Sequence, residues 1–261
     1  MKNPLILAAC ALVLWASTLR ASSIPVPNSS FETQSGVGQP FHVNINMDAW
    51  QKQDRPVYFP ESGYNGFYWI QTAGNFLNPS TPPGIVLNPT GTQAAYILSF
   101  PGAGMFQDYN STDWAGATHV FNAAYQVGQS YELTAGVFGE SVNDGAQIQL
   151  SLYYRDGGNG IVTIGTPNTI TYHAANFPYA DGFGDFNLID FSAIVPAVQA
   201  GDAWAGQHIG INIQVLSGDG TNQWVLDNVR LTETPEPGTL GLLAVGLTGW
   251  MLRRSRGRRA V

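Results

Sequence analysis

Hydrophobic and polar residues alternate along three long stretches between residues 24 and 234. Such alternation puts apolar side chains on one face of an extended strand. No window in this region keeps the 3.6-residue apolar period of an amphipathic helix. The pattern therefore predicts an all-β fold. The alternating apolar positions are Tyr131-Leu133-Ala135-Val137, Ile148-Leu150-Leu152-Tyr154 and Ile209-Ile211-Ile213-Val215.

Shorter strand-like runs fill much of the remaining body, and sequences rich in Gly, Asn and Asp separate them. About ten strands at this spacing predict two packed antiparallel sheets in a single domain. The segment from Asn75 to Asn88 contains three prolines and is predicted to be a surface loop. The shorter runs are Phe41 to Ile45, Phe67 to Gln71, Ala94 to Phe100, Ile161 to Ile164, Thr169 to Tyr172 and Leu188 to Val195.

The last strand-like run contains a break in its alternation. Trp224 and Leu226 share one face, whereas Val229 and Leu231 would point to the other face in a regular strand. A β-bulge at Asp227-Asn228 would return all four apolar side chains to the core.

The first 23 residues have the features of a secretory signal peptide. Lys2 supplies a positive start, Leu5 to Trp15 an apolar core, and Ala21-Ser22-Ser23 a small-residue site for cleavage before Ile24. Leu7-Ala8-Ala9-Cys10 also fits a lipobox, although cleavage there would leave a short apolar region ahead of it.

The last 27 residues have three parts in a fixed order. Pro235-Glu236-Pro237 ends the preceding strand, Gly238 to Leu252 carries no formal charge, and five arginines follow between Arg253 and Arg259. An apolar segment followed by basic residues is typical of a membrane anchor with a cytoplasmic tail. Fifteen helical residues span about 22 Å, less than the ~30 Å of a bilayer core, so a buried or amphipathic terminal helix is the alternative.

This C-terminal segment, residues 235–261, resembles the PEP-CTERM sorting signal of Gram-negative bacteria. The resemblance implies an exported protein that is held at the inner membrane by a short transmembrane helix. It also implies cleavage near Pro235-Glu236-Pro237 by an exosortase, often alongside exopolysaccharide production, and then release to the envelope or extracellular matrix. The sorting signal specifies an address and no activity, and leaves residues 24–234 as the functional domain.

The domain between residues 24 and 234 is strongly acidic. It holds four bases and seventeen acids, a net charge of −13. This charge repels phosphate backbones, which argues against nucleic acid as a partner, and it favours cations such as Ca²⁺. Cys10 is the single cysteine and lies in the signal peptide, so the mature domain has no disulfide.

The two ends of the domain carry a second resemblance. Near the start stands Asn28-Ser29-Ser30-Phe31-Glu32, and near the end Asp227-Asn228-Val229-Arg230-Leu231. These resemble the galactose-binding-like jelly rolls found in carbohydrate-binding modules, which implies a jelly-roll β-sandwich. The resemblance also implies a structural Ca²⁺ that joins the first strand to the last, with Glu32 and Asp227 as carboxylate ligands. Alternatively, both are ordinary strand-end acids bonded to backbone or to Arg230.

Candidate sugar-binding residues are aromatic side chains with polar neighbours, because a sugar ring shows CH groups on its faces and hydroxyls at its edge. Tyr64, Tyr109 and Trp114 lie in two loops of this kind. A third cluster, Phe177 to Phe186, contains four aromatics with Asp181 and Asp185. The alternative for each aromatic is a place in the core of the sandwich.

Sequence motifs of metalloproteases, serine hydrolases and phosphate-binding loops are absent from the chain. We therefore expect a non-catalytic, envelope-associated surface or matrix protein that binds exopolysaccharide. The alternative is a glycoside hydrolase or lyase acting on that polymer, for which Asp181, Asp185 and Asp190 are the candidate acids.

Overall fold

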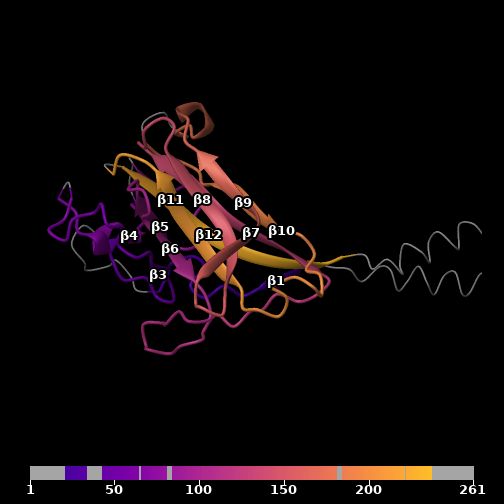
Figure 1. Cartoon of the computed structure of the whole chain (residues 1–261). Coiled ribbons are helices and arrows are strands. Elements are labelled where there is room, and N and C mark those ends of the chain that lie inside the picture. Colours follow the sequence, from indigo (N-terminus) through magenta and orange to yellow (C-terminus); the bar gives the residue numbers. More distant parts are fainter. Residues whose placement is uncertain are drawn as a thin grey trace, which may run out of the picture.

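The computed structural model describes residues 21–33, 43–64, 66–80, 84–180, 184–220 and 222–236. This part of the chain forms twelve β-strands and short 3-10 turns (Figure 1). The 3-10 turns include η2 (Trp69–Gln71) and η3 (Ala174–Asn176). The strands are β1 (Ser22–Ile24), β2 (Val43–Asn44), β3 (Gln51–Lys52), β4 (Ala73–Leu77), β5 (Gln93–Leu98), β6 (Gly104–Gln107), β7 (Gln129–Glu140), β8 (Gln147–Arg155), β9 (Ile161–Thr171), β10 (Ile189–Val195), β11 (Gly210–Ser217) and β12 (Gln223–Pro235).

The strands follow one antiparallel path in the order β2-β4-β5-β12-β7-β10-β9-β8-β11-β6-β3, and β1 pairs with the end of β12. The path curls over, so that two layers face each other around a core and β9 joins them (Figure 1). Gly165 in β9 has φ +68, and a side chain there would collide with the carbonyl of Ile194 on β10. The predicted all-β sandwich is confirmed.

The three long alternating stretches form the centre of this sandwich. They lie in β7, β8 and β11, except that Ile209 directly precedes β11, and all but one of their twelve apolar positions are buried; Tyr154, near the end of β8, is half-buried. The predicted strands at Ala94 to Phe100 and Leu188 to Val195 appear as β5 and β10. Local alternation thus identified the strands that fill the core.

The bulge in the last strand is also confirmed. Asp227 pairs with Gly136 of β7, the next paired residue is Arg230, and Asn228 has φ 57. The extra residue returns Val229 and Leu231 to the core, where they are 2% and 0% exposed. β12 therefore buries apolar side chains on both sides of Asp227.

Other predictions of local structure were wrong. Phe67 to Gln71 contains the 3-10 turn η2 in place of a strand, and the runs at Ile161 to Ile164 and Thr169 to Tyr172 join into the single strand β9. β4 extends to Leu77, into the segment predicted to be a loop, and β3 and β6 were missed. These strands are short or carry buried polar residues, so they lack an apolar alternation.

Buried side-chain amides hold the irregular segment between β1 and β3. The Gln107 amide donates to the carbonyls of Pro27 and Ala49, both at 3.1 Å. The Asn75 amide donates to the carbonyl of Phe31 at 3.0 Å, and the Gln93 amide to that of Glu32 at 2.9 Å. Buried carbonyls outside a sheet need such partners, so these amides replace the missing ladder bonds.

The predicted signal peptide and C-terminal anchor lie largely outside the described residues. β1 begins at Ser22, and Ser22 and Ser23 pair with Glu233 and Thr232 of β12. Cleavage before Ile24 would remove these two residues from the sheet. Among the described residues, no helix has the length and apolar character needed to span a membrane.

Replacement of Asn228 tests the bulge. An L-residue in the left-handed region costs roughly 1–2 kcal/mol, and a β-branched side chain is disfavoured there most. We expect Asn228→Val to lower the free energy of unfolding by about 1–2 kcal/mol in urea titration, while Asn228→Gly stays close to the parent. Equal stability of the Val and Gly variants would contradict the bulge.

A groove over the sheet is the candidate functional site

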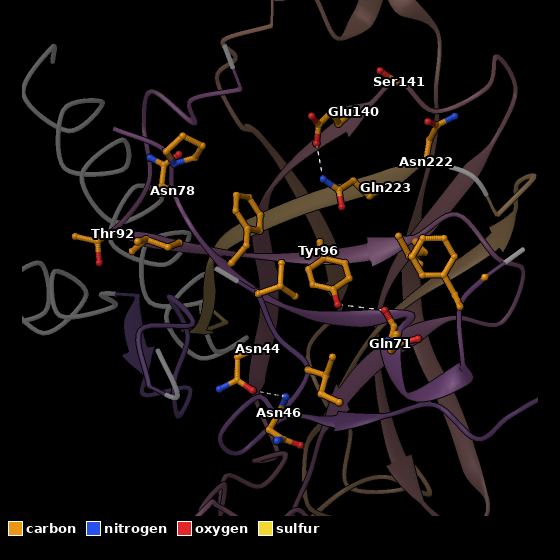
Figure 2. A pocket seen from close by; sticks show the side chains of 18 of the residues that line it. Asn44, Asn46, Gln71, Asn78, Thr92, Tyr96, Glu140, Ser141, Asn222 and Gln223 are labelled. Atoms are coloured by element: carbon orange, nitrogen blue, oxygen red, sulfur yellow. Dashed lines mark hydrogen bonds between the residues drawn. The ribbon is translucent and has the colours of Figure 1, made fainter. Parts of the chain in front are cut away.

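A groove of about 1370 Å³ lies over β2, β4 and β5 and the adjoining ends of β7 and β12 (Figure 2). Six amide side chains and three aliphatic hydroxyls line it, together with Tyr96, Glu140 and seven apolar side chains, so the lining mixes polar and apolar groups. An amide both donates and accepts hydrogen bonds, which suits a ligand rich in hydroxyl groups. The amides are Asn44, Asn46, Gln71, Asn78, Asn222 and Gln223, and the hydroxyls are Ser80, Thr92 and Ser141.

Aliphatic and aromatic side chains together supply the apolar part of the groove. Tyr96 lies over Gly74 of the neighbouring strand, where a Cβ would stand 2.8 Å from the tyrosine ring, so glycine is required there. The Tyr96 hydroxyl donates to the carbonyl of Gln71 at 3.1 Å (Figure 2). Burial raises the pKa of Tyr96 to about 12, which keeps this phenol neutral. Phe67 and Phe76 also line the groove.

One carboxylate, Glu140, occurs in the described lining of the groove. The Gln223 amide donates to its Oε2 at 2.5 Å, across the paired strands β7 and β12 (Figure 2). The hydrogen bond fixes both side chains at one end of the groove. Glu140 can therefore accept a hydrogen bond from a ligand through its remaining oxygen.

Two of the predicted sugar-binding aromatics are exposed, and neither lines this groove. Tyr64 is 44% exposed and lies two residues before Gly66, which does line it. Trp114 is 64% exposed, and its backbone N–H donates to Asp48 Oδ1 at 2.6 Å. The structure therefore places Tyr64 beside the groove and Trp114 on a separate loop.

Tyr109 has no open face for a sugar. The ring stacks between His119, with centroids 3.9 Å apart, and His208, with centroids 3.8 Å apart. The predicted use of Tyr109 as a stacking platform is therefore excluded by its two imidazole neighbours. The sequence does not reveal this stack of three rings, because His119 and His208 come from distant parts of the chain.

The third aromatic cluster belongs mostly to the core. Phe177 and Phe186 are buried against Phe138. Asp185 is buried and accepts a hydrogen bond from the backbone of Ile85, whereas Asp190 forms a 2.7 Å ion pair with Arg230. These two acids have different partners, and Asp181 lies outside the described residues.

Glu32 and Asp227, the predicted Ca²⁺ ligands, meet at the same chain segment. Asp227 Oδ2 accepts from the backbone of Thr90 at 2.6 Å, and Glu32 Oε1 from that of Thr92 at 2.9 Å. Gly91 lies between them with φ +99, and a Cβ there would stand 2.5 Å from the Glu32 carboxylate. The segment from Thr90 to Thr92 thus holds the two acids side by side.

All four carboxylate oxygens of this pair accept protein hydrogen bonds, mostly from backbone N–H groups, as the alternative of backbone-bonded acids predicts. Burial raises the pKa of Asp227 to about 7; backbone N–H groups of Thr90 and Asn228 oppose the shift, and the Glu32 charge adds to it. Within the described residues neither acid forms an ion pair. A bound Ca²⁺ would be held by Glu32 and Asp227 and would offset the repulsion between their two negative charges. No cluster of three or more His, Cys, Asp or Glu residues is found in the described part of the chain, so backbone carbonyls would complete the ligand set.

The groove residues come from segments far apart in sequence. Tyr96 and Leu98 form one face of β5, and their alternation with Ala95 and Ile97 is the signal that could have marked a second apolar face. Asn222-Gln223 and Glu140-Ser141 stand at strand ends, where polar pairs are common. Sequence reasoning missed these residues because their proximity depends on the order of the strands.

Comparison with known families identifies both parts of the chain. The HpiC1 cyclase family model matches residues 22–232, nearly the whole sandwich. The chain belongs to the HpiC1-like family. A PEP-CTERM protein-sorting motif matches residues 233–256, so this HpiC1-like protein carries an export and envelope-sorting signal. No curated protein matches the chain.

Solved structures of two cyclases share the fold of this chain. An apo cyclase from Fischerella sp. is 20% identical, with a TM-score of 0.56 over 82% of this chain and 97% of that one. The Stig cyclase Fisc from Fischerella sp. TAU, solved with (3Z)-3-(1-methyl-2-pyrrolidinylidene)-3H-indole, is 19% identical, with a TM-score of 0.55 over 83% and 99%. A CBM22-1 xylan-binding domain from Paenibacillus barcinonensis matches at 8% identity, with a TM-score of 0.39 over 72% and 86%. The two cyclases establish a shared fold.

The raised pKa of Asp227 predicts how stability depends on pH. An acid whose pKa is higher in the folded state stabilises the fold at low pH, and this contribution is lost as pH rises through the folded pKa. In chelator, we expect the free energy of unfolding to fall by up to about 4 kcal/mol between about pH 4 and 7. Excess Ca²⁺ should remove this fall, because it binds the ionised acids of the folded state.

Asp227→Asn is the control for this measurement, since asparagine has nearly the same shape and does not titrate. Its unfolding free energy, followed by urea titration at each pH, should lack both the fall and the response to Ca²⁺. The Ca²⁺ site would be contradicted if the parent protein and Asp227→Asn showed the same response to pH and the same response to chelator.

Proposed function

We propose that this HpiC1-like protein is a non-catalytic, glycan-binding protein of the cell envelope or extracellular matrix. The sorting motif indicates export, and the proposal extends this to a signal peptide in residues 1–23, a transient membrane anchor and cleavage near Pro235-Glu236-Pro237 by an exosortase. The ligand that fits best is extracellular polysaccharide.

The composition of the groove carries this proposal. Its amides, hydroxyls and aromatic rings combine edge recognition of hydroxyl groups with apolar contact for the faces of a sugar. These amides line a site large enough for several sugar units. Ca²⁺ at Glu32 and Asp227 would have a structural role, because these acids tie the segment after β1 to β12 and do not line the groove.

The charge of the protein supports a neutral glycan over an acidic one. Residues 24–234 carry a net charge of −13, and the one charged side chain in the described groove lining is Glu140. A polyuronate would meet repulsion both at long range and in the groove. Neutral polymers avoid both costs.

Catalysis remains the second candidate, and membership of a cyclase family favours it. Glu140 is the residue that would donate or accept a proton in such a reaction, because it is the single acid in the described lining. A glycoside hydrolase ordinarily needs two carboxylates, and the groove presents one. The lining therefore supports binding more directly than glycan hydrolysis.

Loss of the Gln223 amide tests the groove. Gln223→Ala should weaken binding of a neutral polysaccharide chosen from a glycan array by about twofold to thirtyfold, since it removes hydrogen bonds of roughly 0.5–2 kcal/mol. Gln149→Ala is the matched control, because Gln149 also lies on a strand and donates to a neighbouring side chain, Thr169 Oγ1, outside the groove. Affinity electrophoresis measures both; equal affinities would refute the groove as the binding site.

The catalytic alternative is tested on the glycans that bind. We expect no new reducing ends and no unsaturated sugars after prolonged incubation with the protein. Turnover that is present in the parent and lost in Glu140→Gln would establish an enzyme and overturn the non-catalytic proposal.

A further inference from the structure

The loop between β3 and η2, residues 53–68, gathers exposed apolar side chains. The described chain has thirteen large exposed hydrophobic residues, and five lie in this loop with a sixth, Ile70, just beyond it in η2. Exposed apolar side chains that form one patch mark a contact surface, so this loop is the candidate for one. The six are Val57, Tyr58, Tyr64, Phe67, Tyr68 and Ile70.

Buried ring contacts and hydrogen bonds anchor the loop to the rest of the protein. Phe59 is fully buried and packs edge-on against Trp69 and Phe100, at centroid distances of 5.0 and 5.2 Å. The Trp69 indole N–H donates to the carbonyl of Gln53 at 2.7 Å. Arg55 donates to the carbonyl of Phe59 and forms a 2.8 Å ion pair with Glu61. The loop therefore has a fixed backbone support in the absence of any ligand.

The same loop continues into the groove. Gly66, Phe67 and Gln71 line the groove, and Tyr64 pairs with Phe67 through two backbone hydrogen bonds of 2.8 and 3.0 Å. The Tyr68 backbone N–H donates to Gln71 Oε1 at 2.8 Å. The loop therefore adjoins the groove through Gly66, Phe67 and Gln71, and Tyr64 and Tyr68 lie next to these residues in the chain.

We propose that this loop is an outer binding surface on which a polysaccharide chain leaving the groove stacks its next sugar units. Tyr64 and Tyr68 are 44% and 57% exposed and combine an apolar face with a hydroxyl, which is the chemistry that a sugar face and edge require. Tyr58 is 50% exposed and offers its ring alone, because its hydroxyl donates to the carbonyl of Pro101. The same polysaccharide chain is assigned to the loop because the loop adjoins the groove, and the inference rests on the proposed glycan-binding function. The ligand is accordingly a polymer that binds along its length, with affinity that rises with chain length.

The test compares the disaccharide and hexasaccharide of one neutral polymer, chosen from a glycan array, by titration calorimetry on the full mature protein. The parent should bind the hexasaccharide more tightly. Tyr68→Ala should leave disaccharide affinity unchanged and reduce the ratio of hexasaccharide to disaccharide affinity by roughly threefold to tenfold. Tyr68 is 57% exposed, so the melting temperature should stay close to that of the parent.

Two aliphatic variants form a matched pair. Ile70 is 54% exposed at the loop, and Ile194 is 52% exposed on β10. Ile70→Ala should lower the same ratio, whereas Ile194→Ala should not. If both sugars bind and the ratio is unaffected by Tyr68→Ala and Ile70→Ala, the outer surface is refuted while the groove stands.

Failure of the proposed function gives a different result, in which neither sugar binds the parent. Sedimentation velocity supplies the remaining outcome. A parent dimer that becomes monomeric in Tyr68→Ala, with unchanged sugar affinities, would assign the loop to self-association and overturn the inference.

Discussion

The fold depends on how β12 buries its central carboxylate. β12 pairs with β5 and β1 on one side and with β7 on the other, so Asp227 lies in the middle of the sheet with no solvent contact. The bulge that turns Asp227 toward Thr90 also returns Val229 and Leu231 to the core. The same bulge therefore sets both the packing of β12 and the position of Asp227. A cation bound at Asp227 would stabilise both.

The groove depends in turn on polar groups buried on the opposite face of its strands. Asn75 of β4 and Gln93 of β5 point toward the irregular segment after β1 and bond its carbonyls. Phe76 of β4 and Tyr96 of β5 consequently face outward and line the groove. This reverses the common arrangement, in which apolar residues face the core and polar ones the solvent. The apolar groove lining is held in place by hydrogen bonds behind it.

The sequence predicted those parts of the fold that depend on local alternation. β7, β8, β11 and the bulge at Asp227-Asn228 follow from the period of two and its single break. β4 was missed because Asn75 and Gly74 are not apolar, although the fold buries both. The groove could not be predicted, because Tyr96, Gln223 and Glu140 become neighbours through the strand order β5-β12-β7. Exposure was equally hidden, since Tyr64 and Tyr109 have similar neighbours in sequence and different surroundings in the fold.

Membership of a cyclase family and a binding role are compatible, because a fold sets where a site lies and side chains set its chemistry. Acid catalysis needs a group that holds a proton near neutral pH and can deliver it to the ligand. In this groove Tyr96 has a pKa of about 12 and donates its proton to a backbone carbonyl. Glu140 accepts a hydrogen bond from Gln223 and is the remaining candidate. The other polar groups are amides and hydroxyls, which form hydrogen bonds without changing their charge. The proposal of a neutral ligand rests on this composition, which offers many hydrogen-bonding groups and, within the described lining, a single charge.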